Sequence, residues 1–280
     1  MKVVHTIKDL QAELSALKVQ GKKVGLVPTM GALHAGHASL VKRSVSENGV
    51  TVVSVFVNPT QFNDKNDLEK YPRTLEADCS LLEECGAALV FAPSVSEMYP
   101  EPDTRQFSYA PLDTVMEGAF RPGHFNGVCQ IVSKLFDAVQ PDRAYFGEKD
   151  FQQLAIIREM VRQLNYSLEI VGCPIVREED GLAKSSRNTY LSCEERKAAL
   201  CLSKAVKKGQ ELIRNGIAAS EVLEPMCEII NGEPLARIDY VSMVDALSMQ
   251  PVDSVNADVL VAMAVYIGKT RLIDNFSYEV

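Results

Sequence analysis

The sequence contains no apolar run long enough to cross a membrane. Its longest apolar stretch, residues 259–267, has about half of the ~18 residues that a spanning helix needs. The first ten residues include Lys8 and Asp9 and so lack the apolar core of a secretory signal. The seven cysteines are odd in number and include no CxxC pair, which predicts reduced, mostly buried thiols. We therefore expect a cytoplasmic protein with no membrane partner.

Basic residues are also in the minority. The chain has 29 Lys and Arg against 37 Asp and Glu, a formal net charge of −8. This balance excludes a general attraction to nucleic acid, although a single basic pocket is compatible with it. No GxGxxG motif follows the first predicted strand, and Met263 stands where a P-loop ending at Gly268-Lys269-Thr270 would require glycine. Neither a dinucleotide redox site nor a P-loop is therefore supported.

The order of hydrophobic patterns predicts two domains. Residues 1–176 alternate between strand and helix patterns, which indicates an α/β fold with a Rossmann-like, doubly wound parallel sheet. The polar segment 177–188 follows as a hinge. Two helical patterns and then two strand patterns come after it, so we expect residues 177–280 to form a smaller α+β domain that acts as a hinged lid.

The expected elements follow from apolar periodicity and from Gly and Pro stops. The predicted helices are residues 9–17, 38–47, 74–84, 128–139, 151–164, 194–214 and 219–230. The predicted strands are residues 23–28, 51–57, 88–92, 144–146, 168–171, 237–244 and 259–267.

The segment PTMGALHAGH, residues 28–37, lies where the first predicted strand gives way to a helix. Ligands of open α/β sheets bind at the carboxyl ends of strands, and a helix N-terminus offers N–H groups to a phosphate. Gly31 and Gly36 would let a nucleotide approach the backbone closely. His34 and His37 would share one face and donate hydrogen bonds to phosphate oxygens. The alternative is that both histidines only cap the helix. Zinc is disfavoured because neither of the two other histidines has a partner at ligand spacing.

The segment VNPTQF follows the second predicted strand. Asn58 and Gln61 would project at the same edge of the sheet, and their neutral amides can both donate and accept hydrogen bonds. That chemistry suits a hydroxy acid and its carboxylate. The alternative is an Asn-Pro turn without a function.

The segment RPGHFNGV places a rigid Pro-Gly turn before a helix start. This turn would bring Arg121 and His124 near that start and makes them candidates for substrate binding. A plain surface loop is the alternative.

The segment FGEKDFQQ forms another junction between a strand and a helix. Lys149 is a point charge that could meet a phosphate. Asp150 or Glu148 could hold Mg²⁺, which keeps most of its waters and takes one or two carboxylates. Gln153 is a candidate for the substrate side. The alternative is an exposed loop in which Asp150 caps the helix.

The segment DGLAKSSRN lies in the predicted hinge. Ser185, Ser186 and Arg187, with Lys184 beside them, have the composition of a phosphate clamp that could close over a nucleotide. On its own, such a segment is often a solvated loop.

These five motifs, in this order, resemble the pantothenate synthetases (pantoate–β-alanine ligases) of the HxGH nucleotidyl-transferring superfamily. The resemblance extends over essentially the whole chain. It implies ATP-dependent joining of pantoate to β-alanine through a pantoyl-adenylate, with release of pyrophosphate and AMP, and it implies Mg²⁺ and a cytoplasmic homodimer. We also expect the second predicted strand, residues 51–57, to lie at a sheet edge used by the dimer. In the family Thr60 often has an apolar counterpart, and Lys184 commonly has Met or Leu.

The resemblance also implies roles for single residues. His37 is the family's proton donor, Gln61 contacts both pantoate and β-alanine, and Gln153 is the second pantoate-binding glutamine. The implied ATP-binding residues are Met30, Gly31, Ala32, Leu33, His34, Ala35, Gly36, His37, Gly147, Glu148, Lys149, Asp150, Val176, Lys184, Ser185, Ser186 and Arg187.

The chemistry predicted from the motifs is electrostatic. His34, His37, Lys149, Ser185, Ser186 and Arg187 would stabilise charge on the transferred phosphoryl group and the departing pyrophosphate. Two other functions use the same motif types: a cytidylyl- or adenylyltransferase, which leaves the nucleotide on its product, and a nucleotide sensor without catalysis.

Overall fold

The computed structural model describes all 280 residues, which form two compact units. The first unit comprises Met1–Asp113 and Gly118–Pro174, and the second comprises Thr114–Glu117 and Ile175–Val280. The second unit thus includes four residues from the middle of the first, which the predicted division between residues 176 and 177 did not foresee. The lid role of the second unit stays a prediction.

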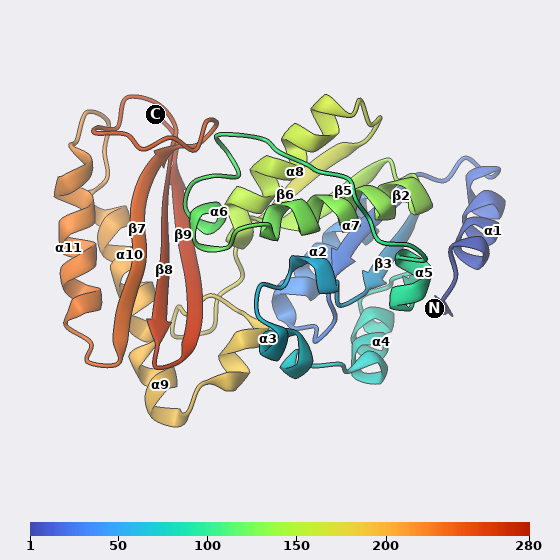
Figure 1. Ribbon diagram of the computed structural model, residues 1–280, viewed down its shortest axis with the longest axis horizontal. Helices are drawn as coiled ribbons and strands as arrows, with labels where there is room; N and C mark the ends of the chain where they lie inside the picture. The colour runs from blue at the N-terminus through green and yellow to red at the C-terminus, as the bar shows by residue number, and fades with distance from the viewer. The chain divides into compact units, whose positions relative to one another are not determined.

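The first unit is built on a six-stranded parallel sheet (Figure 1). The strand order is β1-β4-β3-β2-β5-β6. After the edge strand β1, the chain enters the middle of the sheet at β2, winds outward through β3 and β4, and then crosses to β5 and β6 on the other side of β2. This order confirms the predicted doubly wound sheet. β3 pairs with β2 on one side and β4 on the other, so the prediction that this strand lies at a sheet edge was wrong. The strands are β1 (Lys2–Val4), β2 (Val24–Thr29), β3 (Val50–Val55), β4 (Leu89–Phe91), β5 (Arg143–Gly147) and β6 (Glu169–Cys173).

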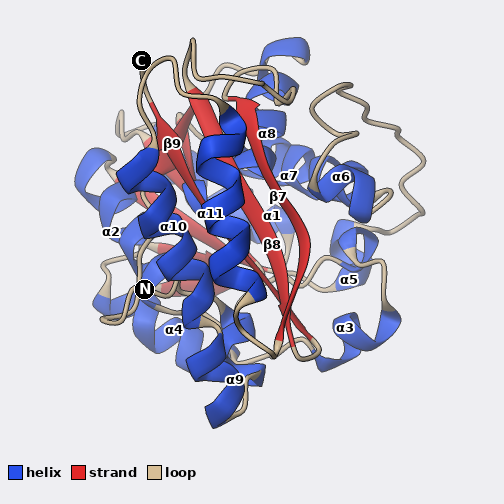
Figure 2. Cartoon of the chain, turned by 90° about the vertical axis from the view of Figure 1, so that its left-hand side faces the viewer, coloured by secondary structure: helices blue, strands red, loops and turns tan.

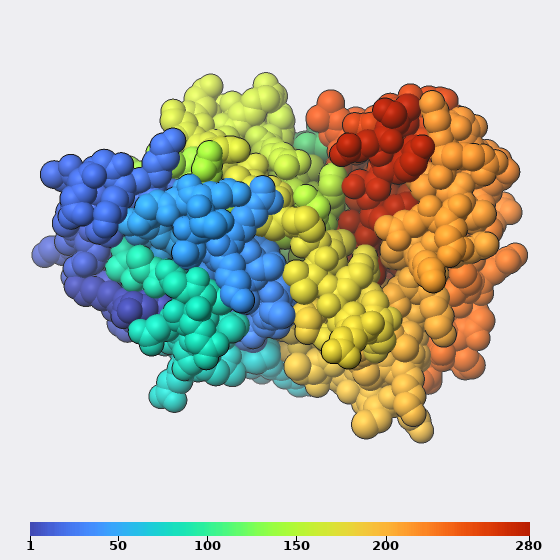
Figure 3. Space-filling view, turned by 180° about the vertical axis from the view of Figure 1, so that it is seen from behind, coloured from blue at the N-terminus to red at the C-terminus, as the bar shows by residue number.

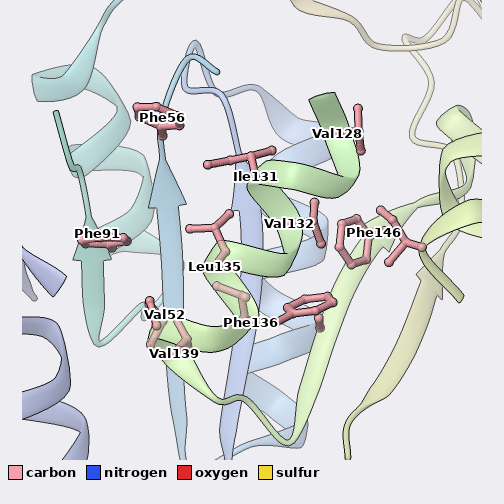
Figure 4. Packing of buried hydrophobic residues seen from close by; sticks show 14 of the residues in the cluster. Val52, Phe56, Phe91, Val128, Ile131, Val132, Leu135, Phe136, Val139 and Phe146 are labelled. Atoms are coloured by element: carbon pink, nitrogen blue, oxygen red, sulfur yellow. The ribbon is translucent and has the colours of Figure 1, made fainter. Parts of the chain in front are cut away.

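Helices cover both faces of this sheet because its strands carry apolar side chains on both faces. Consecutive residues of β3 point to opposite faces and show the division: Val52 packs in one core cluster and Val53 in another. The larger cluster contains the apolar side chains of α7 together with Phe91 and Phe146 from the strands (Figure 4). The opposite face is covered by α2 and α4. The helices of this unit are α1 (Ile7–Lys18), α2 (Ala35–Glu47), α3 (Lys65–Lys70), α4 (Leu75–Glu84), α5 (Val95–Met98), α6 (Glu117–Phe120, which begins in the second unit), α7 (His124–Val139) and α8 (Phe151–Gln163), with short 3-10 turns at Pro59–Gln61 and Glu148–Asp150.

The N-terminal strand closes one edge of the sheet. β1 pairs with β4 in parallel, and the Met1 ammonium lies 3.2 Å from a Glu83 carboxylate oxygen. Figure 3 shows these dark blue residues beside turquoise residues of α4. β1 has only three residues, too few to give a period, and it was not predicted.

The second unit is a three-stranded antiparallel sheet with helices on one face (Figure 2). Its strands are β7 (Ala236–Asp245), β8 (Val259–Ile267) and β9 (Thr270–Tyr278), and its helices are α9 (Cys193–Ala198), α10 (Leu200–Leu212) and α11 (Ala219–Asn231), with a 3-10 turn at Ser186–Tyr190. This arrangement confirms the smaller α+β part of the predicted fold. No helix in either unit combines the length and the apolar character that a membrane span requires.

Candidate active site

Three of the predicted motifs begin where neighbouring strands of the first unit end. β3, β2 and β5 are adjacent and parallel. They end at Val55, Thr29 and Gly147, where these three motifs lie. The carboxyl ends of parallel strands share one edge of a sheet, which is where open α/β folds bind ligands. The structure therefore brings these three motifs to one edge.

The loop between β2 and α2 contains two residues in the left-handed region. Gly31 has φ +79° and Ala32 has φ +51°. A Cβ on Gly31 would lie 3.0 Å from an Asp78 carboxylate oxygen and 3.1 Å from a Val55 methyl group. Thr29 also fixes the loop, because its hydroxyl donates to Ser54 O at 2.6 Å and accepts from Gly31 N at 3.2 Å. Both the space and the backbone conformation thus favour glycine at position 31.

His34 and His37 open α2 as a reciprocal cap. Gly36 N donates to His34 Nδ1 at 3.1 Å, and His34 N donates to His37 Nδ1 at 3.3 Å. The ring centroids are 4.1 Å apart. A ring nitrogen that accepts a backbone N–H carries no proton, so each neutral ring has its proton on Nε2. The capping role and the donor role are therefore compatible: the cap sets the tautomer that presents Nε2–H.

His37 is held in its neutral form. Burial, then His34, then the charge of Lys149 lower the pKa of His37 to about 3. Lys149 stands at the end of β5, and its effect on His37 shows that the motif after β5 approaches the motif after β2. At neutral pH this corner combines a neutral N–H donor with an ammonium group, and both can bind a phosphate.

Gln61 is oriented by a network of buried polar groups. Asn58 is 1% exposed, and its Nδ2 donates to Gln61 Oε1 at 3.1 Å. The amide nitrogen of Gln61 then faces Met30, with Nε2 3.0 Å from Sδ. Tyr99, which no sequence motif indicated, donates its hydroxyl to Asn58 Oδ1 at 2.7 Å. Thr60 donates to the same oxygen at 3.2 Å. Asn58 therefore acts on Gln61 from within the protein.

Arg121 and His124 support the same turn. Arg121 has only donors, so its contact with His124 Nε2 at 3.1 Å places the ring proton on Nδ1, which donates to Gln61 O at 2.9 Å. His124 is buried. A Cβ on Gly127 would lie 2.4 Å from Thr60 O, so this glycine allows α7 to touch the turn. The predicted substrate residues Arg121 and His124 thus hold the backbone of Gln61.

The two glutamines that open α8 have different surroundings. Gln152 is buried and donates to Leu112 O at 2.8 Å. The side chain of Gln153 is half-buried and makes no hydrogen bond within the protein. Only Gln153 therefore has an amide ready for another molecule. Asp150, one turn earlier, is exposed and makes no side-chain cap.

Val176 and the predicted clamp residues lie in the second unit, on a short hairpin and the 3-10 turn that follows it. Lys184 N donates to Val176 O at 3.0 Å, and Glu178 N donates to Leu182 O at 2.8 Å. Arg177 fastens this hairpin to β9 through two bonds to the buried Asp274, at 2.8 and 2.9 Å. Lys184 Nζ lies 2.7 Å from Glu178, so its charge is paired within the hairpin.

Beyond the hairpin, the clamp segment starts a 3-10 turn. Ser185 caps that turn by accepting from Arg187 N at 3.3 Å, and Ser186 is its first residue. The Val176 N–H donates to no group of the protein, whereas its carbonyl is used by Lys184.

Comparison with known proteins shows the family. The family model described as pantoate-beta-alanine ligase matches residues 2–277. The chain belongs to the pantoate–β-alanine ligase family. It is similar to the pantothenate synthetase of Bacteroides thetaiotaomicron, with 71% identity over 100% of this chain and 99% of the relative. The predicted ligase activity, the joining of pantoate to β-alanine in pantothenate biosynthesis, is thereby confirmed.

Solved structures of this ligase family have the same fold. The pantothenate synthetase of Thermus thermophilus has a TM-score of 0.93 and 47% identity, covering 99% of each chain. The pantoate–β-alanine ligase of Francisella tularensis, complexed with β-γ ATP and β-alanine, has a TM-score of 0.82 and 34% identity, covering 99% of this chain and 97% of that one.

Proposed function

We propose that ATP binds at the ends of β2 and β5 and that the carboxylate of pantoate attacks its α-phosphorus. The bond from this phosphorus to the bridging oxygen breaks, and pyrophosphate leaves. The neutral amine of β-alanine then attacks the carbonyl carbon of pantoyl-adenylate, the bond to AMP breaks, and the new amide nitrogen loses one proton. The observation that carries this proposal is the pair of capped histidines, both with the proton on Nε2, beside Lys149.

The proposed roles follow from what each group can donate. His34 and His37 would donate Nε2–H to oxygens of the α-phosphate, and the Lys149 ammonium would stabilise the leaving pyrophosphate. Because no nucleophile of the chain is needed, the chain contributes positioning and electrostatics. Met30 and residues 31–37, with Gly147 and Glu148, would form the backbone wall around the nucleotide.

Pantoate would lie between the two available glutamines. Gln61 has its carbonyl occupied by Asn58, so it offers N–H to the carboxylate or hydroxyls of the acid. Gln153 offers an amide with no partner in the protein. Asn58, Arg121 and His124 would act through Gln61 rather than by touching the substrate.

Mg²⁺ fits this site as an ion that arrives with the nucleotide. The chain has no group of three or more His, Cys, Asp or Glu that could hold a metal by themselves, and Mg²⁺ commonly takes only one or two carboxylates. Asp150 is exposed at the right strand end, whereas Glu148 Oε1 would be 2.9 Å from a Cβ on Gly172 and so lies towards β6. We assign Asp150 as the carboxylate. When bound, the ion supplies positive charge to the phosphates.

The second unit would contribute the clamp. Ser185, Ser186 and Arg187 have hydroxyl and guanidinium donors for phosphate oxygens, and Val176 has a backbone N–H for the adenine. Lys184 would not join them while it remains paired with Glu178. As a lid, this unit would protect the adenylate from water.

Location and assembly complete the proposal. All seven cysteines are free thiols, which suits a reducing cytoplasm. A homodimer, implied by the family, would show in sedimentation of the purified protein as twice the 30.8 kDa of the chain.

Pyrophosphate release with Mg-ATP, in the presence and absence of pantoate, tests the chemistry. Pantoate-dependent pyrophosphate, followed by AMP release when β-alanine is added, is the expected result. A product that keeps the nucleotide would indicate a nucleotidyltransferase. Nucleotide binding without turnover would indicate a sensor, and either outcome would overturn the proposal.

A further inference from the structure

Asp78 is a buried carboxylate without a cation. It lies on α4, is 2% exposed, and forms no ion pair with any Lys, Arg or His. A buried charge in this position is costly unless hydrogen bonds replace the water that it has lost. The groups that donate hydrogen bonds to Asp78 therefore show which part of the chain its carboxylate fixes in place.

Two of the three donors to Asp78 come from the loop before α2. Ala32 N donates to Oδ2 at 3.1 Å and Leu33 N donates to Oδ1 at 2.8 Å. The third is the hydroxyl of Thr74, at 3.2 Å from Oδ1. Both carboxylate oxygens are thus engaged by consecutive backbone amides of a left-handed turn.

The position of this turn decides where the histidine cap stands. Leu33 is joined directly to His34, whose own N–H donates to His37 Nδ1. Ala32 lies in the left-handed region at φ +51°, a conformation that alanine adopts only when the surroundings enforce it. A carboxylate that accepts from residues 32 and 33 supplies that enforcement.

We propose that Asp78 is a positioning residue for adenylate formation: its carboxylate fixes the Gly31–Leu33 turn and thereby aims the Nε2–H groups of His34 and His37. The inference rests on the proposed role of the two histidines as phosphate donors. Asp78 touches neither the nucleotide nor the acid in this scheme.

Asp78→Asn is the informative change because it keeps the volume of the side chain. The amide replaces one acceptor by a donor, so one of the two backbone N–H groups loses its partner. We expect the single-turnover rate of pantoate-dependent pyrophosphate formation to fall about 10²-fold, as misplacement of a reacting group by about 1 Å can cause. Amide formation from supplied pantoyl-adenylate and β-alanine should change little, because no phosphoryl transfer occurs in that step.

Glu76→Gln is the matched control. Glu76 lies two residues earlier on the same helix, is exposed, and makes no side-chain hydrogen bond. Its replacement removes the same charge without touching the turn and should leave both half-reactions at the wild-type rate. A wild-type rate of adenylation in Asp78→Asn would overturn the proposal. An equal loss in both half-reactions would also overturn it, because that result indicates damaged packing.

Hydrogen exchange in the wild-type protein gives a test that needs no variant. The amides of Ala32 and Leu33 should be protected, and exchange at the rate of an open loop would overturn the proposal even if Asp78→Asn does not fold. If wild-type enzyme forms no pantoate-dependent pyrophosphate, the proposed function fails, while protection of these amides still reports separately on Asp78. If His37→Gln adenylates normally, the aiming of the histidines is refuted.

Discussion

The imidazole of His37 makes the stability of the protein depend on pH. Burial, His34 and Lys149 lower the pKa of His37 from 6.5 to about 3. As the pH falls below 6.5, this ring binds a proton in the unfolded chain but stays neutral in the folded chain. The stability that neutral His37 contributes is therefore complete above pH 6.5 and is lost progressively as the pH falls towards about 3.

His37→Gln removes this titration with little harm to the helix start. Glutamine at the third helical position can accept the N-cap backbone N–H, as His37 does. In the wild-type protein the ring should lower the unfolding free energy by about 1.4 kcal/mol for each pH unit below 6.5. Between about pH 7 and about pH 5 the loss of unfolding free energy that this ring causes is about 2 kcal/mol. Over the same pH interval, the unfolding free energy of the variant should therefore fall by about 2 kcal/mol less than that of the wild type.

Urea unfolding followed by circular dichroism at the two pH values measures this difference. Other titrating groups are common to both proteins and cancel in the comparison. His5→Gln is the control, because His5 is exposed and its replacement leaves His37 in place; it should show the wild-type loss. A His37→Gln protein with the same pH dependence as the wild type would refute the buried, neutral state of this ring.

The networks behind the site give three further predictions. Tyr99→Phe removes the hydroxyl that donates to Asn58 Oδ1 at 2.7 Å. Steady-state kinetics should show a several-fold rise in the KM for pantoate, and urea unfolding should show that the unfolding free energy falls by about 1–3 kcal/mol. Unchanged values would contradict the role of this network. Asp274→Asn leaves the Arg177 guanidinium without its buried carboxylate partner. The unfolding free energy measured in urea should fall by about 3 kcal/mol. A fall of less than about 1 kcal/mol would contradict the role of this ion pair. Gln153→Ala should raise the KM for pantoate about tenfold with little change in unfolding, and an unaltered KM would remove this residue from the acid's site.

The sheet of the first unit could be predicted because each central strand is a short apolar run between turn signals. β2, β3 and β5 lie within two residues of their expected bounds, since strands buried on both faces carry little else but apolar residues. The start of α2 was expected at residue 38 and lies at Ala35. The apolar pattern begins only at Ala38, whereas the first turn of the helix is stabilised by the capping hydrogen bonds of His34 and His37.

The strands of the second unit were harder to predict where buried polar residues interrupt the apolar pattern. β9 was not assigned a range because Asp274 and Asn275 interrupt its apolar pattern, yet both are buried. Asp274 is buried because Arg177 neutralises it. The helix expected over 194–214 is divided at Ala199, where α9 ends and α10 begins; nothing in the composition of this stretch marks that point.

The motifs revealed the residues that can face a substrate, but not the residues that hold them. Asp78 is 45 positions from Leu33, Tyr99 is 41 from Asn58, and Asp274 is 97 from Arg177. A motif is short, so such partners fall outside it. One signal was nevertheless present: Asp78 shares the buried face of its helix with Leu82, four residues later. An acidic residue within an apolar stripe must find donors, and the nearest unsatisfied donors in an α/β sheet are the amides of loops at the strand ends.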